Sequence, residues 1–361
     1  MERVRTVFNH DTAHAYPELT TARVEFQSGR ALIRTAPGDV IQLHPGLAPE
    51  FDAIVDHYRS LGIACADEII WDTSPEVISE FPDAEWSIYI FARAHHGLRP
   101  NDVRLAATEM FDRKNEFVPW CESLGFPVPE TLPFDRGGTP NLDGLEYPLY
   151  VKASWATGGL GVVECGDRAE VASAVAAMDT DYQLQRRVPA DRWVNVLYEA
   201  KGGTAQHLVT TEQRIDRSTW VGSRYPSEYD PRRVTDPAAA AMALRGIEGP
   251  FGIDVGVIES GDDIDFVIIE ANPRLNASTY FWWTAERVGA AQWMGAKIPS
   301  RHRRLEPLLA AIEDLIYVPQ SGTGVIIGQW NTLSDGKVGV LFAGTEAQQD
   351  GLYAEVARRL E

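Results

Sequence analysis

The stretch that most constrains this chain is residues 251–278, FGIDVGVIESGDDIDFVIIEANPRLNAS. Asp254 ends one apolar run, and after a polar turn a second apolar run carries Glu270, Asn272 and Arg274 in alternation. A β-hairpin would place Asp254 and Glu270 on neighbouring strands. Because successive side chains of a strand point to opposite faces, Glu270, Asn272 and Arg274 would project to one side.

Two carboxylates, an amide oxygen and a guanidinium make a poor core, but they suit a site for magnesium and phosphate. Hard oxygen ligands hold Mg²⁺, the metal bridges phosphate oxygens, and an arginine offsets the charge that the metal leaves. Taken alone, Asp254 and Glu270 are equally well explained as solvated carboxylates at strand ends. The surrounding EANPRLN sequence favours the metal site.

The charge balance limits the partners of the chain. Its 361 residues carry a formal net charge of −19, which argues against nucleic acid and anionic membrane surfaces. An anionic substrate would therefore need a local cationic pocket or a bound metal. Three widely spaced cysteines, no apolar leader and no run long enough to span a membrane predict a cytoplasmic protein. The length predicts two or three domains.

Hydrophobic periodicity predicts alternating strands and helices at the N-terminus, typical of a small parallel sheet with crossover helices. There is no G-x-G-x-x-G sequence there, so no dinucleotide is assigned. Helices are expected at 49–61, 101–124, 169–178, 237–244, 281–294 and from 345 onward, and strands at 40–43, 65–71, 86–91, 147–153, 162–165, 182–185, 193–200, 207–213, 324–330 and 338–343. This pattern predicts an α/β fold.

Lys152 ends the strand YPLYVK just before a glycine-rich turn that contains Gly158, Gly159 and Gly161. Glycines there would let backbone N–H groups approach phosphate oxygens with no Cβ in the way. The turn is not a Walker A sequence, because no Gly-Lys-Ser/Thr follows. A plain hairpin turn is the alternative, and the preceding lysine favours phosphate binding. Lys114 would supply a second phosphate cation, although a single lysine on a helix is usually solvated.

The order of Lys114, Lys152, the glycine-rich turn and the acidic hairpin resembles the ATP-grasp superfamily over about residues 100–295. The resemblance implies an ATP-grasp fold with α+β lobes that clamp the nucleotide. Its expected domains are a Rossmann-like leading domain at 1–103, a small lobe with the glycine-rich loop at 104–184, and a large lobe with the metal site and a C-terminal extension at 185–361. The segment SGTGVIIGQWNTLSDGKVGVLFAG more loosely resembles pheganomycin-type peptide ligases.

The resemblance also implies how ATP is bound. Lys114 and Lys152 would contact its phosphates, and the loop of Gly158, Gly159 and Gly161 would close over it. Within QLQRRV, Gln185 stands where the superfamily commonly places an acidic residue toward the adenine amino group. The backbone of Val188 would meet the adenine ring. Downstream the usual ribose-binding Glu is replaced, and Asp191 is the candidate for that contact.

For the metal and the reaction, the resemblance implies that Asp254, Glu270 and Asn272 hold two Mg²⁺ ions, with Mn²⁺ as a substitute. Arg274 matches an arginine of members similar to carbamoyl-phosphate synthetase and biotin carboxylase, where a tetrahedral oxyanion would form, and Asn276 would assist it. Arg214 lies on a strand that the fold would turn toward the acceptor. A ligand for a substrate carboxylate and a surface arginine are equally supported there.

The expected activity is a carboxylate–amine ligase that makes an amide or peptide bond through an acyl phosphate. Its substrates would be small acids and amines, such as amino acids or a short peptide, in the biosynthesis of a small metabolite. A bicarbonate-activating carboxylase or carbamoyl-phosphate-type enzyme is one alternative, and a non-catalytic nucleotide-binding protein is another. The superfamily also suggests a homodimer.

Overall fold

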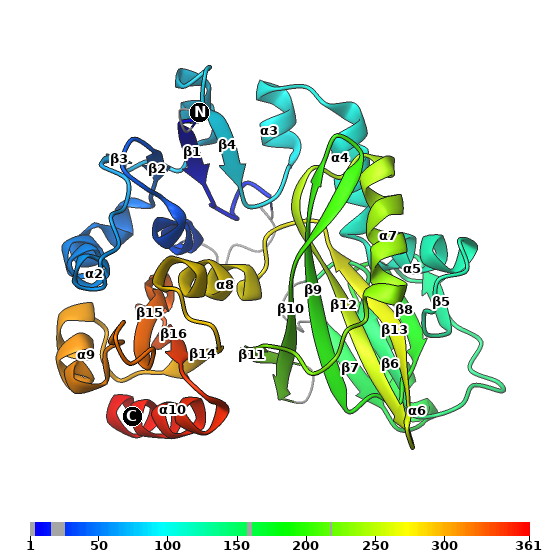
Figure 1. Ribbon diagram of the computed structural model, residues 1–361. Coiled ribbons are helices and arrows are strands. Elements are labelled where there is room, and N and C mark those ends of the chain that lie inside the picture. Colours follow the sequence, from blue (N-terminus) through cyan, green and yellow to red (C-terminus); the bar gives the residue numbers. More distant parts are fainter. Residues whose placement is uncertain (1–3, 16–25, 157–160, 217–218) are drawn as a thin grey trace. The chain divides into compact units, whose positions relative to one another are not determined.

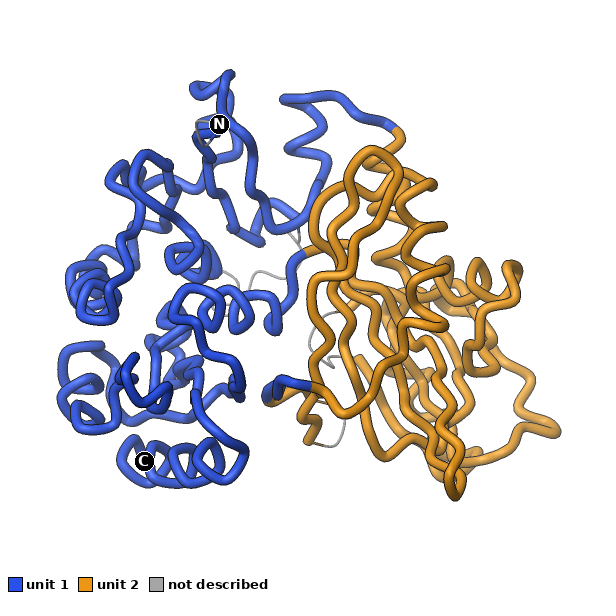
Figure 2. The backbone as a smooth tube through the Cα atoms, viewed as in Figure 1, with its two compact units in different colours: residues 1–102, 222–226, 275–361 blue, residues 103–221, 227–274 orange. Residues whose placement is uncertain are grey.

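The structure is a computed structural model that describes residues 4–15, 26–156, 161–216 and 219–361. The chain divides into two compact units, which Figure 2 shows in blue and orange. Unit 1 comprises residues 1–102, 222–226 and 275–361, and unit 2 comprises residues 103–221 and 227–274. This grouping by contacts places the C-terminal segment with the N-terminal one. The division into three domains that the sequence suggests stays a prediction.

Unit 1 begins with the expected parallel sheet, whose strand order is β3-β2-β1-β4 (Figure 1). In the central strand, Val7 lies opposite Val40 of β2 on one side and Trp86 of β4 on the other. Val7 and Val40 are fully buried, as expected for parallel strands covered by helices. The elements are β1 (Thr6–Asn9), η1 (Gln27–Arg34), β2 (Val40–Gln42), η2 (Pro45–Leu47), α2 (Ala48–Ser60), β3 (Glu68–Ile70), η3 (Pro75–Glu80), β4 (Glu85–Ile88) and α3 (Arg93–Leu98).

The C-terminal part of unit 1 is antiparallel, with β16 between β14 and β15. Residues 222–225 of β11 pair with β14. The elements are α8 (Ala277–Val288), β14 (Trp293–Pro299), α9 (Leu305–Ala311), η4 (Glu313–Leu315), β15 (Gly324–Gln329), η5 (Trp330–Thr332), β16 (Lys337–Ala343) and α10 (Glu346–Leu360). The predicted helix at 281–294 is wrong at both ends. Gly289, with φ of 69°, stops α8 in a left-handed cap, and Trp293 already belongs to β14.

Unit 2 contains a small antiparallel sheet of order β5-β8-β6-β7 and the larger antiparallel array β13-β12-β9-β10. Its elements are α4 (Asp102–Phe111), α5 (Lys114–Ser123), β5 (Thr131–Phe134), β6 (Leu149–Ala153), β7 (Val162–Cys165), α6 (Arg168–Ala176), β8 (Tyr182–Arg186), β9 (Arg192–Lys201), β10 (Thr204–Asp216), β11 (Thr219–Tyr225), α7 (Arg232–Arg245), β12 (Gly249–Ser260) and β13 (Asp263–Asn272). Among the described residues, no helix combines the length and apolarity that a membrane crossing requires.

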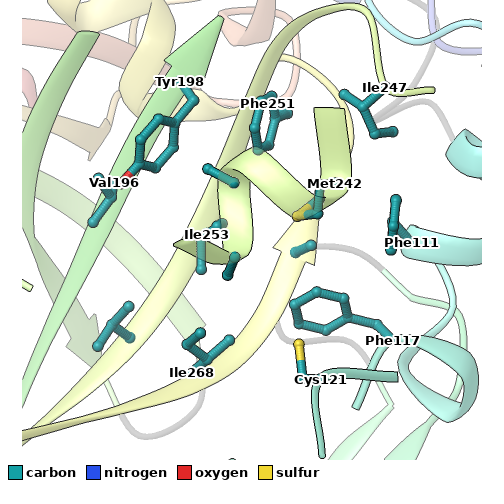
Figure 3. Close-up of a cluster of buried hydrophobic side chains, with 14 of the residues drawn as sticks. Phe111, Phe117, Cys121, Val196, Tyr198, Met242, Ile247, Phe251, Ile253 and Ile268 are labelled. Atoms are coloured by element: carbon teal, nitrogen blue, oxygen red, sulfur yellow. The ribbon is translucent and has the colours of Figure 1, made fainter. Parts of the chain in front are cut away.

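The core of unit 2 lies on one face of the larger array, where α4, α5 and α7 supply its helical side (Figure 3). Val196 on β9 and Ile253 on β12 are fully buried in this cluster. Because strand side chains alternate, the residues between the core positions, such as Asn195 and Asp254, project to the other face. The apolar face therefore fixes the register, and the register decides which polar side chains meet on the opposite face.

Candidate active site

The acidic hairpin forms as the sequence predicted, with Asp254 of β12 directly opposite Glu270 of β13 and Gly252 opposite Asn272. The register shifts next to this pair, between Asp254 and Val255. Such an irregularity re-aims side chains and is common beside active sites. The two carboxylates and the Asn272 amide therefore come from adjacent positions on neighbouring strands.

Asp254 is enclosed by three amide groups. Asn195 Nδ2 donates to its Oδ1 at 2.7 Å, and Gln213 Nε2 donates to the same oxygen at 2.6 Å. Asn272 Nδ2 donates to Oδ2 at 2.9 Å. Burial and then the charge of Glu270 raise the pKa of Asp254 to about 7, although the amides oppose this shift. Two buried carboxylates this close repel each other, and the repulsion acts mainly on Asp254, whose amide partners carry no positive charge.

Glu270 faces cationic side chains. Lys114 Nζ lies 3.1 Å from Glu270 Oε2, and the lysine side chain is only 11% exposed. Burial raises the pKa of Glu270, but Lys114, Lys152 and Arg274 together lower it below its usual value. Glu270 is thus the carboxylate of the pair that stays ionised, because the positive charges surround it.

Lys152 reaches the site from the end of β6. Its Nζ donates to Gln185 Oε1 at 2.6 Å, and Gln185 Nε2 in turn donates to Thr131 Oγ1 at 3.2 Å. Burial lowers the pKa of Lys152 to about 8, against the opposing charge of Glu270. The sequence placed Gln185 toward adenine, whereas in this structure its side chain bridges Lys152 and Thr131.

A break in the first helices of unit 2 builds another part of the site. The single helix predicted at 101–124 is wrong: α4 ends at Phe111 and α5 starts at Lys114. The backbone N–H of Lys114 donates to Ser154 O at 2.8 Å, so the break is held by a tertiary hydrogen bond that periodicity does not reveal. Asp112 lies in this break and is placed to meet Arg274.

Arg274 is buried beside Asp112, with 3.6 Å between its Nε and Asp112 Oδ1. Trp155 Nε1 donates to the other oxygen of Asp112 at 2.8 Å. The hydrogen bond from Trp155 orients the Asp112 carboxylate, and the ion pair at 3.6 Å keeps its negative charge beside the guanidinium. Arg274 also joins the cations that lower the pKa of Glu270.

The most unusual group of the site is Gln183, which lies opposite Lys152 in the pairing of β8 with β6. The residue is fully buried, and neither its Oε1 nor its Nε2 has a hydrogen-bond partner within the described residues. Thr211 Oγ1 also has no hydrogen-bond partner within the described residues. Thr211 lies on β10, opposite Asn195 of β9. An unsatisfied buried amide costs about 1–3 kcal/mol, so Gln183 and Thr211 are candidates for contacts with a ligand.

These residues fit a magnesium–phosphate group. Among the described residues no set of three His, Cys, Asp or Glu side chains forms a metal cage. Mg²⁺ usually takes one or two protein carboxylates and completes its shell with phosphate and water. Asp254 and Glu270 would supply such a pair, and a bound cation would offset their mutual repulsion. A bound phosphate would give a hydrogen bond to the Gln183 amide, which has no partner among the described residues.

Unit 2 also carries a cavity of about 420 Å³ lined by Tyr147, Arg186, Arg187 and Val188 among others. Val188 is 8% exposed and packs in a small apolar cluster with Ala190 and Ile269. Val188, the predicted contact for adenine, thus lies at an apolar wall of a cavity that is large enough for a heterocyclic base.

Not every predicted residue joins the site. Gly158 and Gly159 lie outside the described residues. Gly161 has φ of 66°, and a Cβ on it would lie 2.9 Å from the Ala153 Cβ, so a glycine is needed at this turn. Asp191 is exposed just before β9.

Two of the predicted catalytic residues are placed differently from expectation. Arg214 follows Gln213, whose side chain reaches Asp254, so by strand alternation Arg214 projects to the other face of β10. Asn276 belongs to unit 1 and caps α8, accepting the Thr279 N–H at 3.0 Å. This local role accounts for the asparagine without any contact to a substrate.

Sequence reasoning missed Asn195, Gln213, Gln183 and Asp112. Asn195 and Gln183 each interrupt apolar residues of their strands, as in Val194-Asn195-Val196 and Tyr182-Gln183-Leu184, whereas Gln213 stands between Glu212 and Arg214. Polar residues that alternate with buried ones on central strands were a usable signal. Asp112 carried no such signal, because its place depends on the helix break.

Comparison with known proteins agrees with this geometry. A family model described as the ATP-grasp domain matches residues 112–278. No curated protein matches the sequence.

Solved structures resemble the chain over nearly its whole length. N5-carboxyaminoimidazole synthetase from Staphylococcus aureus, complexed with ADP, is 11% identical, with 98% of this chain and 97% of that chain covered and a TM-score of 0.62. An L-amino acid ligase from Bacillus licheniformis is 13% identical, with 99% and 98% covered and a TM-score of 0.60. Biotin carboxylase from Campylobacter jejuni is 15% identical, with 95% and 88% covered and a TM-score of 0.59. At these identities the likeness shows the fold, and the α/β ATP-grasp fold predicted from the sequence is confirmed.

Proposed function

We propose that this chain, which belongs to the ATP-grasp superfamily through its residues 112–278, is an ATP-dependent ligase that joins a carboxylate to an amine through an acyl phosphate. The observation that carries the proposal is the Asp254–Glu270 pair, with Lys114 and Lys152 gathered around Glu270. A carboxylate does not react with an amine at neutral pH. Transfer of the γ-phosphoryl group to it creates a far better electrophile, and ADP and phosphate are released.

The side chains around the hairpin would bind the triphosphate. Asp254, Glu270 and Asn272 would hold Mg²⁺, which would offset the negative charge of the phosphates. Lys114 would exchange its contact with Glu270 for a phosphate oxygen. Lys152, with its pKa of about 8, remains mainly protonated at neutral pH and would donate to a second one.

Arg274 would stabilise the reaction itself. Attack of the amine on the acyl phosphate produces an oxyanion, and a fixed guanidinium in a buried site stabilises such a charge strongly. Asp112 and Trp155 limit its freedom, so little reorganisation is needed when the charge develops. The Gln183 amide, which is buried and has no hydrogen-bond partner among the described residues, would donate to the phosphate that departs.

The cavity at Val188 would receive the adenine ring, with the apolar wall at Ile258 and Val267 against its face. The ribose contact of Asp191 and the homodimer stay predictions. Of the solved structures with this fold, one is an L-amino acid ligase and others are N5-carboxyaminoimidazole synthetases. We therefore propose an amino acid or another small organic acid as the activated carboxylate, with bicarbonate as the alternative to be tested against it.

The deciding experiment measures ADP and phosphate release with ATP and Mg²⁺ over pooled amino acids, short peptides and small acids. Separate arms contain an organic acid with an amine, bicarbonate with an amine, and no acceptor. The proposal expects release that needs both an organic acid and an amine, and an amide product of the combined mass. Release with bicarbonate alone would identify the carboxylase alternative. ATP-dependent thermal stabilisation without release in any arm would indicate a nucleotide-binding protein.

A further inference from the structure

Unit 1 holds a buried arginine that is neutralised by no carboxylate among the described residues. Arg30, on η1, is only 8% exposed, and its Nε donates to Gln27 O at 3.2 Å. Within the described residues Arg30 takes part in no ion pair, and its side chain makes no other hydrogen bond; its Nη atoms keep some contact with solvent. Buried charges in proteins are normally paired, because the loss of hydration is otherwise expensive.

Aromatic rings surround this guanidinium. Its central carbon lies 4.4 Å from the centroid of the Tyr280 ring and 5.2 Å from that of Tyr89. Cation–π contacts hold the arginine in place, but they leave the hydrogen-bonding edge of the fork unused. His10 lies beside Tyr280: its Nδ1 is 3.0 Å from the Tyr280 hydroxyl, and its Nε2 is 3.0 Å from Ser87 Oγ.

The cluster lies where α/β folds bind ligands. His10 directly follows β1 and Tyr89 directly follows β4, and these two parallel strands are paired neighbours. Ligands of open parallel sheets bind outside the carboxyl ends of the strands. Because burial and then the charge of Arg30 lower the pKa of His10 to about 3, the imidazole is neutral at physiological pH. The group at this edge is therefore a net cation with polar neutral neighbours.

We infer that Arg30, with Tyr280, Tyr89 and His10 around it, is a binding site for a carboxylate of the substrate. The fork geometry of a guanidinium matches a carboxylate through two parallel hydrogen bonds. Among its described residues the cluster has no carboxylate pair for a metal and no lysine, so it would hold a carboxylate that is bound and not activated, as in an amino acid that supplies its amine. The identification of this ligand as a substrate rests on the proposed function.

The test is made on the full chain without ATP or Mg²⁺, so that it does not depend on ligase activity. Calorimetry measures binding of each of the common L-amino acids, of their carboxamides, and of inorganic phosphate. We expect at least one amino acid to bind, its carboxamide to bind much more weakly, and phosphate not to compete with it. Binding of carboxamides equally well, displacement by phosphate, or no amino-acid binding at all would each overturn the inference.

Variants locate the site. Arg30→Met should weaken binding of the amino acid by roughly 10- to 100-fold, which is the loss expected for a charge-assisted bidentate contact. Arg30→Lys keeps the charge and the ring contact but loses the fork, so we expect roughly 10-fold weaker binding from a protein whose fold is preserved. Arg34→Met is the matched control, because Arg34 is exposed on the same η1 helix and stacks on Trp283 at 5.5 Å. Unchanged affinity in Arg30→Lys and Arg30→Met, or an equal loss in Arg34→Met, would refute the assignment.

Failure here and failure of the proposed ligase activity are distinguishable. If amino acids bind through Arg30 while no acid–amine pair releases ADP, the proposed activity is wrong and the carboxylate site remains. If ADP release occurs but Arg30 variants bind and turn over like the wild type, the ligase remains and this site is refuted.

Discussion

Lys114 Nζ, at the start of α5, lies 3.1 Å from Glu270 Oε2 on β13, so a cation rests against a proposed metal ligand. The contact links the helix break at Asp112 to the acidic hairpin within unit 2. It also means that binding of a divalent cation at Glu270 has to replace an existing ion pair. The lysine is then available to a phosphate oxygen of the nucleotide.

Glu270→Ala is expected to reduce ADP release by roughly 100-fold or more, because the metal loses one of two carboxylates. The fold should persist, since the hairpin pairing does not depend on this side chain. ADP release and circular dichroism measure the two effects. Asp263→Ala, an exposed carboxylate at the turn of the same hairpin, is the control and should behave as the wild type. Normal turnover in Glu270→Ala would remove the metal assignment.

Gln183→Met should separate stability from binding. Gln183 is a buried amide with no partner in the described part of the chain, so replacing it by an apolar side chain of similar length should raise the free energy of unfolding by about 1 kcal/mol. The same change should weaken ATP binding by roughly 10-fold, because the nucleotide loses the hydrogen bond that the Gln183 amide donates. Urea unfolding and nucleotide titration measure both. Gln349→Met, at a buried glutamine of unit 1, is the control and should leave nucleotide affinity unchanged. A less stable Gln183→Met protein that binds ATP normally would contradict the prediction.

Arg274→Ala should slow turnover while ATP affinity is largely retained, since the guanidinium is proposed to act on the oxyanion. Asp112→Asn should have the same effect to a smaller degree, about 10-fold, because it frees the orientation of Arg274 without removing it. Steady-state rates and nucleotide dissociation constants separate the two quantities. If either variant lost ATP binding and turnover in equal proportion, Arg274 would be a nucleotide ligand and not a catalytic residue.

The stability of unit 1 should fall in acid. Burial, and then the charge of Arg30, lower the pKa of His10 to about 3 from an ordinary value of 6.5. The unfolded chain therefore binds a proton more readily, so this contribution is complete above pH 6.5 and is lost as the pH falls toward 3. At pH 4 the loss is about 3 kcal/mol.

His57, whose pKa burial lowers to about 4, adds to the same trend. His10→Asn isolates one contribution, because the variant should show a shallower decline in the free energy of unfolding between pH 7 and pH 4. Chemical unfolding across this range is the measurement. Parallel curves for the variant and the wild type would mean that His10 is not buried as a neutral imidazole.

Much of the site could be predicted from the sequence because it depends on strand alternation. Asp254, Glu270 and Asn272 lie on two strands joined by a short turn, and local pairing is enough to bring them together. Lys152 ends a strand that was also recognisable. In each case the pattern of a few neighbouring residues decides where the side chain projects.

The remaining features depend on contacts between distant segments. The division of 101–124 at Asp112 is maintained by Ser154, far along the chain, and helical periodicity continues across it. Arg214 was placed by analogy, and only the pairing of β10 with β9 reveals that its neighbour Gln213 faces Asp254. The role of Asn276 as a helix cap depended on where α8 starts, and helix boundaries are the least predictable part of a sequence pattern.

The alternation of Glu270, Asn272 and Arg274 along one strand end restricts how this hairpin can change in evolution. Loss or gain of one residue in the paired part of β13 would invert all three side chains at once, exchanging them with their apolar neighbours. Changes by pairs of residues, or changes within the exposed turn at 260–263, would leave their directions intact. Homologous chains should therefore differ freely in the length of this tip while conserving the odd–even phase of the segment that follows it.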